Sequence, residues 1–153
     1  MKVCEEFYIN GEWVKPVNDL KTLDVINPAT EEVFGRIALG DKDDVDAAVE
    51  AAYTAFETFG YSSVDERVSL LEKILEVYQS KYDEIAETIS AEMGAPIGLS
   101  KAAQAATGLG HFSTALETLK NYKFEEVKGS ALIRKEPIGV VGMITPWNWP
   151  INQ

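Results

Sequence analysis

The feature that most constrains the fold is a nearly all-apolar run, Ile138–Thr145, which leads directly into a turn bounded by Pro146 and Pro150. The run is rich in β-branched residues and is too short for a typical helix. Strands that are apolar on both faces lie in the middle of parallel sheets that helices cover. The run therefore predicts a buried strand of an α/β fold.

The turn after this predicted strand holds one hydrogen-bonding amide side chain, that of Asn148. Pro146 favours extended backbone at Thr145, and Pro150 prevents a regular strand ladder further on. Open α/β sheets bind ligands at the carboxyl ends of their strands. A neutral amide donor suits an oxygen that becomes negative only in the transition state. The residues alone leave open a second interpretation, in which Asn148 merely bonds nearby backbone.

Short strands are predicted in the first forty residues. Asn10 and Gly11 lie between aromatic and β-branched residues, which is typical of a hairpin over residues 7–14 with a type I′ turn. Residues 23–26 and 32–37 are expected to form two more strands. Residues 131–136, before the apolar run, are expected to form an exposed strand or β-arm.

Helices are predicted between these β regions. Asp41 is expected to cap a first helix that ends at Gly60, and Ser63 with Glu66 matches a capping box for a second. The apolar stripe of residues 64–89 is too wide for a coiled-coil seam, so it predicts packing on a globular core. We expect a break near residue 80 and a third helix over about residues 99–121.

Composition and charge exclude several classes of function. The chain has 153 residues and a net charge of −11, which disfavours nucleic-acid binding. Its apolar stretches are too short to span a membrane, and its N-terminus lacks a long apolar signal region. Cys4 is the one cysteine, so we expect no internal disulfide and a cytoplasmic location. His111, the one histidine, is expected to pack or form a local hydrogen bond, and no metal site is expected.

Motifs spread over residues 6–153 resemble the aldehyde dehydrogenase superfamily. The turn Pro146–Pro150 resembles that family's Pro-Trp-Asn-Phe-Pro signature, with Trp149 in place of Phe, and residues 135–142 are similar to its approach to the same strand. Residues 8–13 and 26–32 resemble the family's amino-terminal hairpin and its Asn-Pro-Ala-Thr segment. Residues 92–96 resemble its Glu-x-Gly-Lys-Pro segment, with Ala95 in place of Lys.

The resemblance implies an activity and a site. Family members oxidise an aldehyde to a carboxylic acid: a cysteine thiolate attacks the aldehyde, hydride passes to NAD or NADP, and a glutamate-assisted water hydrolyses the thioester. By resemblance, Asn148 donates to the oxyanion. The residues that would line the cofactor cleft are Ile144, Thr145, Pro146 and Trp147. The implied partners are a small aldehyde substrate and further copies of the chain, in a dimer or tetramer.

The resemblance also implies an architecture: the N-terminal part of the aldehyde dehydrogenase fold, with a β-hairpin, helices, a β-arm and the start of a Rossmann-like parallel sheet, left incomplete. Residues 1–123 would begin the NAD(P)-binding domain and residues 124–141 would form the oligomerisation β-arm. Residues 142–153 would give the first strand of the cofactor-binding sheet, truncated.

The family's nucleophilic cysteine, general-base glutamate and glycine-rich cofactor turn all lie beyond the asparagine motif, and Cys4 matches none of them. We therefore expect residues 1–153 to be an inactive fragment of a complete aldehyde dehydrogenase. The alternatives are a non-catalytic remnant that acts only as a binding or oligomerisation module, and a free-standing helical adaptor. The substrate aldehyde and the choice between NAD and NADP are not specified by these residues.

Overall fold

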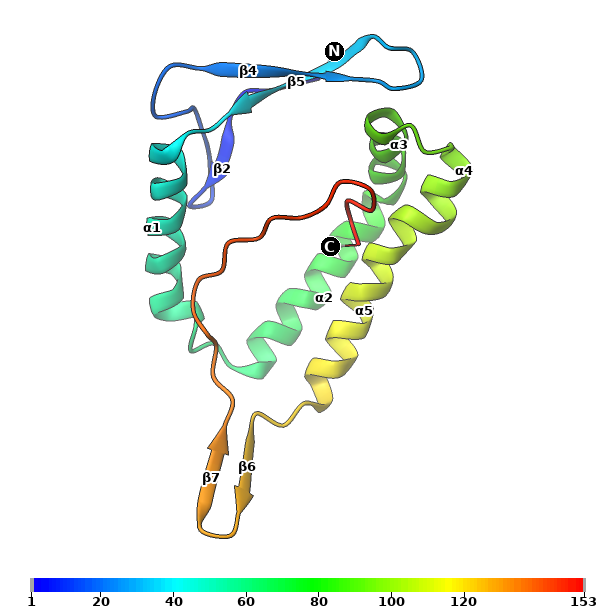
Figure 1. The fold of residues 1–153 in the computed structure, drawn as a ribbon. Helices are drawn as coiled ribbons and strands as arrows, with labels where there is room; N and C mark the ends of the chain where they lie inside the picture. The colour runs from blue at the N-terminus through cyan, green and yellow to red at the C-terminus, as the bar shows by residue number, and fades with distance from the viewer. Residues whose placement is uncertain (1, 153) are drawn as a thin grey trace.

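The computed structural model describes residues 2–152, which form β-strands near the N-terminus, a group of helices, a projecting hairpin and a long C-terminal segment (Figure 1). The first hairpin pairs β2 (Phe7–Ile9) with β3 (Glu12–Val14). Asn10 and Gly11 at its tip have φ of 54° and 82°. A type I′ turn requires positive φ at both central residues, so the predicted hairpin is confirmed.

A three-stranded sheet has the order β1-β5-β4. β4 (Lys21–Ile26) pairs antiparallel with β5 (Val33–Leu39), and an Asp24–Arg36 ion pair of 2.9 Å joins directly opposed residues. These strands confirm the predictions at residues 23–26 and 32–37. β1 (Lys2–Cys4) pairs parallel with β5 and was not predicted. Its three residues are exposed and carry no periodic pattern, so only the pairing identifies it.

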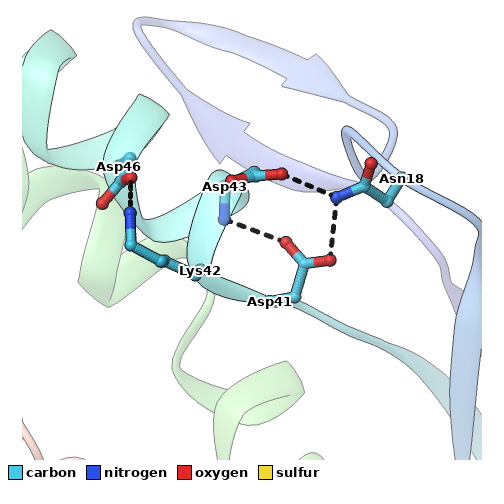
Figure 2. A network of polar contacts seen from close by, with 5 residues as sticks. All are labelled: Asn18, Asp41, Lys42, Asp43 and Asp46. Carbon is cyan, nitrogen blue, oxygen red and sulfur yellow. Dashed lines mark hydrogen bonds and ion pairs between the residues drawn. The ribbon is translucent and has the colours of Figure 1, made fainter.

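The start of α1 (Lys42–Phe59) is held by a network of carboxylates (Figure 2). The Asp41 side chain accepts a hydrogen bond from the Asp43 backbone N–H at 2.9 Å, as predicted for an N-cap. Asn18 Nδ2 donates to the carboxylates of Asp41 and Asp43 at 3.0 and 2.9 Å. The buried Asp44 carboxylate accepts from the Val17 backbone N–H at 2.8 Å. The loop before β4 is thereby fixed to the first turn of α1.

The core lies among α2 (Val64–Ser80), α3 (Tyr82–Met93) and α5 (Ala105–Asn121). Ser63 and Glu66 form the predicted capping box, and the predicted break falls at Lys81. Tyr78 is buried between α2 and α5, where its hydroxyl donates to the Ala105 carbonyl at 2.7 Å. Burial raises the pKa of Tyr78, which keeps the hydroxyl a donor.

The helix predicted over residues 99–121 starts earlier and is not regular. α4 (Ile97–Leu99) leads into η1 (Ser100–Gln104), a π-helical turn, which continues into α5. In η1 the Ala105 N–H donates to the Ser100 carbonyl, five residues back. Residue periodicity does not distinguish such a turn from an α-helix, so the sequence did not predict it.

Within residues 124–141, β6 (Glu125–Lys128) and β7 (Ala131–Arg134) form a hairpin that projects away from the helices (Figure 1). From here on, this hairpin is called the β-arm. Every residue of both strands is exposed. The predicted exposed strand near residues 131–136 is confirmed, and it ends at Arg134. Within residues 2–152, no helix combines the length and the apolar character needed to cross a membrane.

The mixed α/β class is confirmed, but the buried strand predicted over Ile138–Thr145 is not formed among the described residues. The segment returns from the β-arm towards the helices without pairing (Figure 1). Ile138 and Ile144 are 94% and 102% exposed. A strand needs a neighbour to bond its backbone groups, and none of the strands within residues 2–152 pairs with this segment. The apolar pattern identified a segment suited to burial, not one that is buried here.

Candidate active site

The turn that carries Asn148 lies at the C-terminal end of the described chain. It packs against α5 near Tyr78 of α2 (Figure 1). Gln104, the last residue of η1, donates from Nε2 to the Asn148 backbone carbonyl at 3.4 Å. Within the turn, the Asn152 N–H donates to the Trp149 carbonyl at 3.0 Å. The turn is therefore attached to the helices and closed by its own backbone.

Two further contacts attach the end of the turn to α5. A Cβ placed on Gly108 would lie 2.2 Å from Ile151 Cγ2, so only glycine permits this approach. A hydrogen bond of 2.8 Å joins His111 Nε2 and Asn152 Oδ1. Because an amide oxygen only accepts, Nε2 carries the proton. His111 was expected to pack or to form a local hydrogen bond, and its hydrogen-bond partner instead lies 41 positions away in sequence.

The Asn148 side chain is exposed, and within residues 2–152 its amide makes no hydrogen bond to nearby backbone. The contact that holds the residue runs through its backbone carbonyl. The amide hydrogens are therefore available to a bound molecule. This geometry favours the interpretation of Asn148 as a donor over its interpretation as a turn-stabilising side chain.

Ile144, Thr145, Pro146 and Trp147, the residues expected to line a cofactor cleft, are all exposed in the extended stretch before Asn148. Ile144 is 102% exposed and Trp147 is 79% exposed. No strand or helix includes this stretch, so its backbone polar groups are also free of any ladder. Their place in a cofactor cleft therefore stays a prediction.

A cavity of about 750 Å³ lies elsewhere in the described structure. It is bounded by the end of α1, the start of α2 and the β-arm, and its lining includes Phe56, Arg67, Tyr122 and Arg134. None of the predicted site residues lines it. The turn combines an exposed amide with a defined attachment to the helices. In this cavity, by contrast, Arg134 is paired with Glu125 and Glu136.

Sequence reasoning missed the residues that hold the turn. Gln104 gave no signal, because it lies 44 positions from Asn148 within a predicted helix. The close approach of Gly108 to Ile151 of the turn and to Tyr78 was not predicted either. Among residues 2–152, no cluster of three or more His, Cys, Asp or Glu side chains could hold a metal ion. Cys4 lies exposed in β1.

Comparison with known proteins gives a consistent result. The sequence profile of the aldehyde dehydrogenase family matches residues 13–153. A 3-succinoylsemialdehyde-pyridine dehydrogenase of a Pseudomonas species is 49% identical over 154 residues, which cover 100% of this chain and 32% of that protein. The chain thus spans about a third of the length of this curated relative.

Solved structures agree. An aldehyde dehydrogenase from Bartonella henselae superposes with a TM-score of 0.96 at 44% identity, over 100% of this chain and 33% of that one. Aldehyde dehydrogenase C from Pseudomonas syringae, solved as a mutant in complex with NAD⁺ and octanal, gives a TM-score of 0.94 at 40% identity. That match covers 97% of this chain and 30% of the other.

Proposed function

Because the chain belongs to the aldehyde dehydrogenase family, we propose that the whole protein oxidises an aldehyde to a carboxylic acid with NAD or NADP. By the whole protein we mean this chain continued to the length of its relatives, of which it spans about a third. The activity is that of an oxidoreductase, and the relative solved with NAD⁺ and octanal supports both the type of cofactor and the type of substrate.

The observation that carries the proposal is the state of Asn148: its carbonyl is held by Gln104 while its side-chain amide is exposed and unbonded within residues 2–152. An aldehyde oxygen gains negative charge when a nucleophile adds to the carbonyl. A fixed neutral donor binds that oxygen more strongly in the transition state than in the substrate, and such differential binding accelerates the reaction. We therefore assign Asn148 the role of oxyanion donor.

The segment Ile144–Trp147 is proposed to line the cofactor cleft. When bound, the nicotinamide group accepts the hydride. This segment would contribute binding surface: its exposed apolar side chains can pack on rings, and its unpaired backbone groups can bond polar linkages. The side chains fit that role, and no acidic residue lies within the segment to repel the phosphates of either cofactor.

Residues 1–153 are proposed to be inactive by themselves. The mechanism needs a thiolate nucleophile, and the one cysteine, Cys4, lies exposed in the edge strand β1 and matches no nucleophile position of the family. The same lone cysteine supports a cytoplasmic location, where thiols stay reduced.

A second role is favoured by the β-arm. Its hairpin exposes Val127 and Leu132, at 72% and 58%, together with its edge backbone groups. Exposed strand edges with apolar side chains are sites of pairing between chains. We propose that the β-arm joins copies of the whole protein into a dimer or tetramer, and that it could act as a binding module even without catalysis.

The assay that tests the proposed activity follows the absorbance of the reduced cofactor. The whole protein is incubated with NAD or NADP and a panel of aliphatic and aromatic aldehydes, and residues 1–153 are tested in parallel. We expect turnover of at least one aldehyde by the whole protein and none by residues 1–153. No turnover by the whole protein with any aldehyde would contradict the activity. Turnover by residues 1–153 that survives Cys4→Ala would contradict the assigned mechanism.

A further inference from the structure

We propose that Gln104 is a positioning residue for Asn148, holding the backbone of the turn so that the Asn148 amide meets the reacting oxygen. The inference rests on the proposed function, because it needs Asn148 to act as a donor. It assigns a role to a buried side chain that lies 44 positions away in sequence and does not itself touch substrate.

The contact is specific in its geometry. The Gln104 side chain donates from Nε2 to the Asn148 carbonyl at 3.4 Å, and Gln104 is only 3% exposed. No other protein group is found to bond the Asn148 backbone carbonyl within residues 2–152. At 3.4 Å the contact is longer than the roughly 2.7–3.2 Å that is usual for an N–H···O hydrogen bond, so it is a weak one. Its loss should therefore shift the turn locally without unfolding the helices.

The local helix geometry supports the same role. Gln104 ends the π-helical turn η1, in which the Ala105 N–H reaches back five residues to Ser100. A π-turn inserts an extra residue into a helix, changes the direction of the side chains around it, and is frequent at functional sites. A regular α-helix at this point would direct residue 104 differently. The irregularity thus ends at Gln104, the helical residue whose side chain bonds Asn148.

The choice of an amide at this buried position also needs a reason. Gln104 Oε1 is buried and has no hydrogen-bond partner within residues 2–152. An unpaired buried acceptor destabilises a fold, and a hydrocarbon side chain of equal size would avoid that cost. The hydrogen bond from Nε2 to Asn148 is the one polar contact here that a methionine could not make.

The remaining attachments act on the other end of the turn. Ile151 packs on Gly108, and Asn152 bonds His111. These contacts fix where the turn ends, but neither acts on Asn148 itself. Removing the Gln104 bond should therefore free the Asn148 backbone while the end of the turn stays attached. This separation makes a test of Gln104 alone informative.

The test is a double-mutant cycle in the whole protein, with Gln104→Met and Asn148→Ala. Methionine keeps the length and volume of glutamine and removes the donor. A misplacement of about 1 Å costs roughly 10² in rate, so we expect Gln104→Met to lower kcat about 10- to 100-fold with little change in the KM for the aldehyde. In the Asn148→Ala background the same change should lower kcat less than about twofold, because coupled residues are not additive.

The outcomes separate the two proposals. If Asn148→Ala leaves kcat unchanged, the site assignment and this inference both fail. If Asn148→Ala lowers kcat but Gln104→Met does not, or the two losses multiply, Asn148 keeps its role and the inference about Gln104 is overturned. Gln79→Met, the same change at an exposed position of α2, is the control and should leave kcat unaltered.

Hydrogen exchange, which does not depend on turnover, shows whether a lower kcat of Gln104→Met results from loss of folding. Hydrogen exchange of the whole protein should show faster exchange in residues 147–152 for Gln104→Met, with α2 and α3 unchanged. If exchange instead rises throughout α2, α3 and α5, Gln104 is a packing residue and the inference is overturned. Should Gln104→Met fold poorly, Gln104→Asn keeps the amide but shortens its reach, and the same two measurements decide the question.

Discussion

The backbone of Asn148 is hydrogen-bonded to the helices, whereas its side chain is exposed. The carbonyl accepts a hydrogen bond from Gln104, and the amide is left exposed. An asparagine in a turn commonly uses its side chain to bond nearby backbone. Here the helices provide the attachment instead, so the side chain does not have to. In the role that we propose for it, a donor held in this way would not need to reorganise when charge develops on the substrate oxygen.

A glycine at the end of α3 gives a prediction at the residue scale. Gly94 has φ of +76°, and a Cβ on it would lie 2.7 Å from Pro28 Cγ. Gly94→Ala should lower the free energy of unfolding by roughly 1–3 kcal/mol, because the residue must stay left-handed. Gly98→Ala is the matched control, since nothing lies within 4 Å of its Cβ position and its φ is ordinary. Denaturant titration of the whole protein measures both, and equal effects would contradict the account.

Single residues were predictable where their neighbours in sequence decide their conformation. Asn10 with Gly11 specified a turn, and Asp41 and Ser63 specified helix starts, because each acts on backbone within three residues. Gln104 was not predictable, because its partner lies 44 positions away. Asn148 was identified by its motif, but its exposure and its free amide required the structure.

The capping box of α2 gives a prediction at the scale of elements. Hydrogen bonds from the Ser63 backbone N–H and hydroxyl hold the pKa of Glu66 below its ordinary value. A carboxyl group whose pKa is lower in the folded than in the unfolded state stabilises the fold at pH values above its unfolded pKa. This stabilisation is lost as the pH falls through the pKa of the folded state. Near neutral pH the wild-type protein should therefore have a higher melting temperature than Glu66→Gln. The difference between the two melting temperatures should disappear below about pH 4.

Thermal melts of the whole protein from neutral to acid pH test this prediction. Glu57→Gln, which removes one negative charge at an exposed position of α1, is the reference for the general effect of charge. A gap between wild type and Glu66→Gln that stays constant with pH, after correction by this reference, would show that the ionised carboxylate does not support the cap.

The segment Ile138–Thr145 shows the limit of prediction for elements. Its composition indicated a strand, and the described residues leave it unpaired with Ile144 fully exposed. Helix starts depend on a few adjacent residues, whereas a strand depends on a partner that can lie anywhere in the chain. For the same reason β1 was missed, since its three residues form a strand only through β5.

We predict that Ile138–Thr145 is a paired and buried strand in the whole protein. An extended, β-branched segment with this much apolar surface gains free energy from pairing and burial. Hydrogen exchange should be slow at its amides in the whole protein and fast in residues 1–153. Fast exchange at these amides in both would mean that the segment stays unpaired, and the proposed start of a cofactor-binding sheet would be wrong.

At the scale of the whole molecule, the described chain leaves large apolar surfaces uncovered. Besides Ile138 and Ile144, Met143 is 81% exposed, and Val45 on α1 is 58% exposed. Exposed apolar patches of this kind mark surfaces that other protein covers. The chain spans 30% to 33% of the solved relatives, so the length needed to cover these surfaces is present in those proteins.

Residues 1–153 purified alone should therefore self-associate or melt without a sharp transition. Unpaired apolar strands promote association between chains. Sedimentation velocity and a thermal scan measure this, and Met143→Glu with Ile144→Lys should reduce the association by placing charges in the exposed segment. A monodisperse monomer with a sharp cooperative melt would contradict the account, because it would show that the exposed surface needs no further cover.

The most direct test of the central claim is the turnover number of Asn148→Ala in the whole protein, with Asn121→Ala, the same change at an exposed amide at the end of α5, as control. Loss of one oxyanion donor typically costs about 10²–10³ in kcat, or roughly 2.7–4 kcal/mol. We expect that loss for Asn148→Ala, with the melting temperature and the cofactor Kd nearly unchanged. If Asn148→Ala instead unfolds the protein, and the folded remainder keeps its kcat, then Asn148 only stabilises the turn.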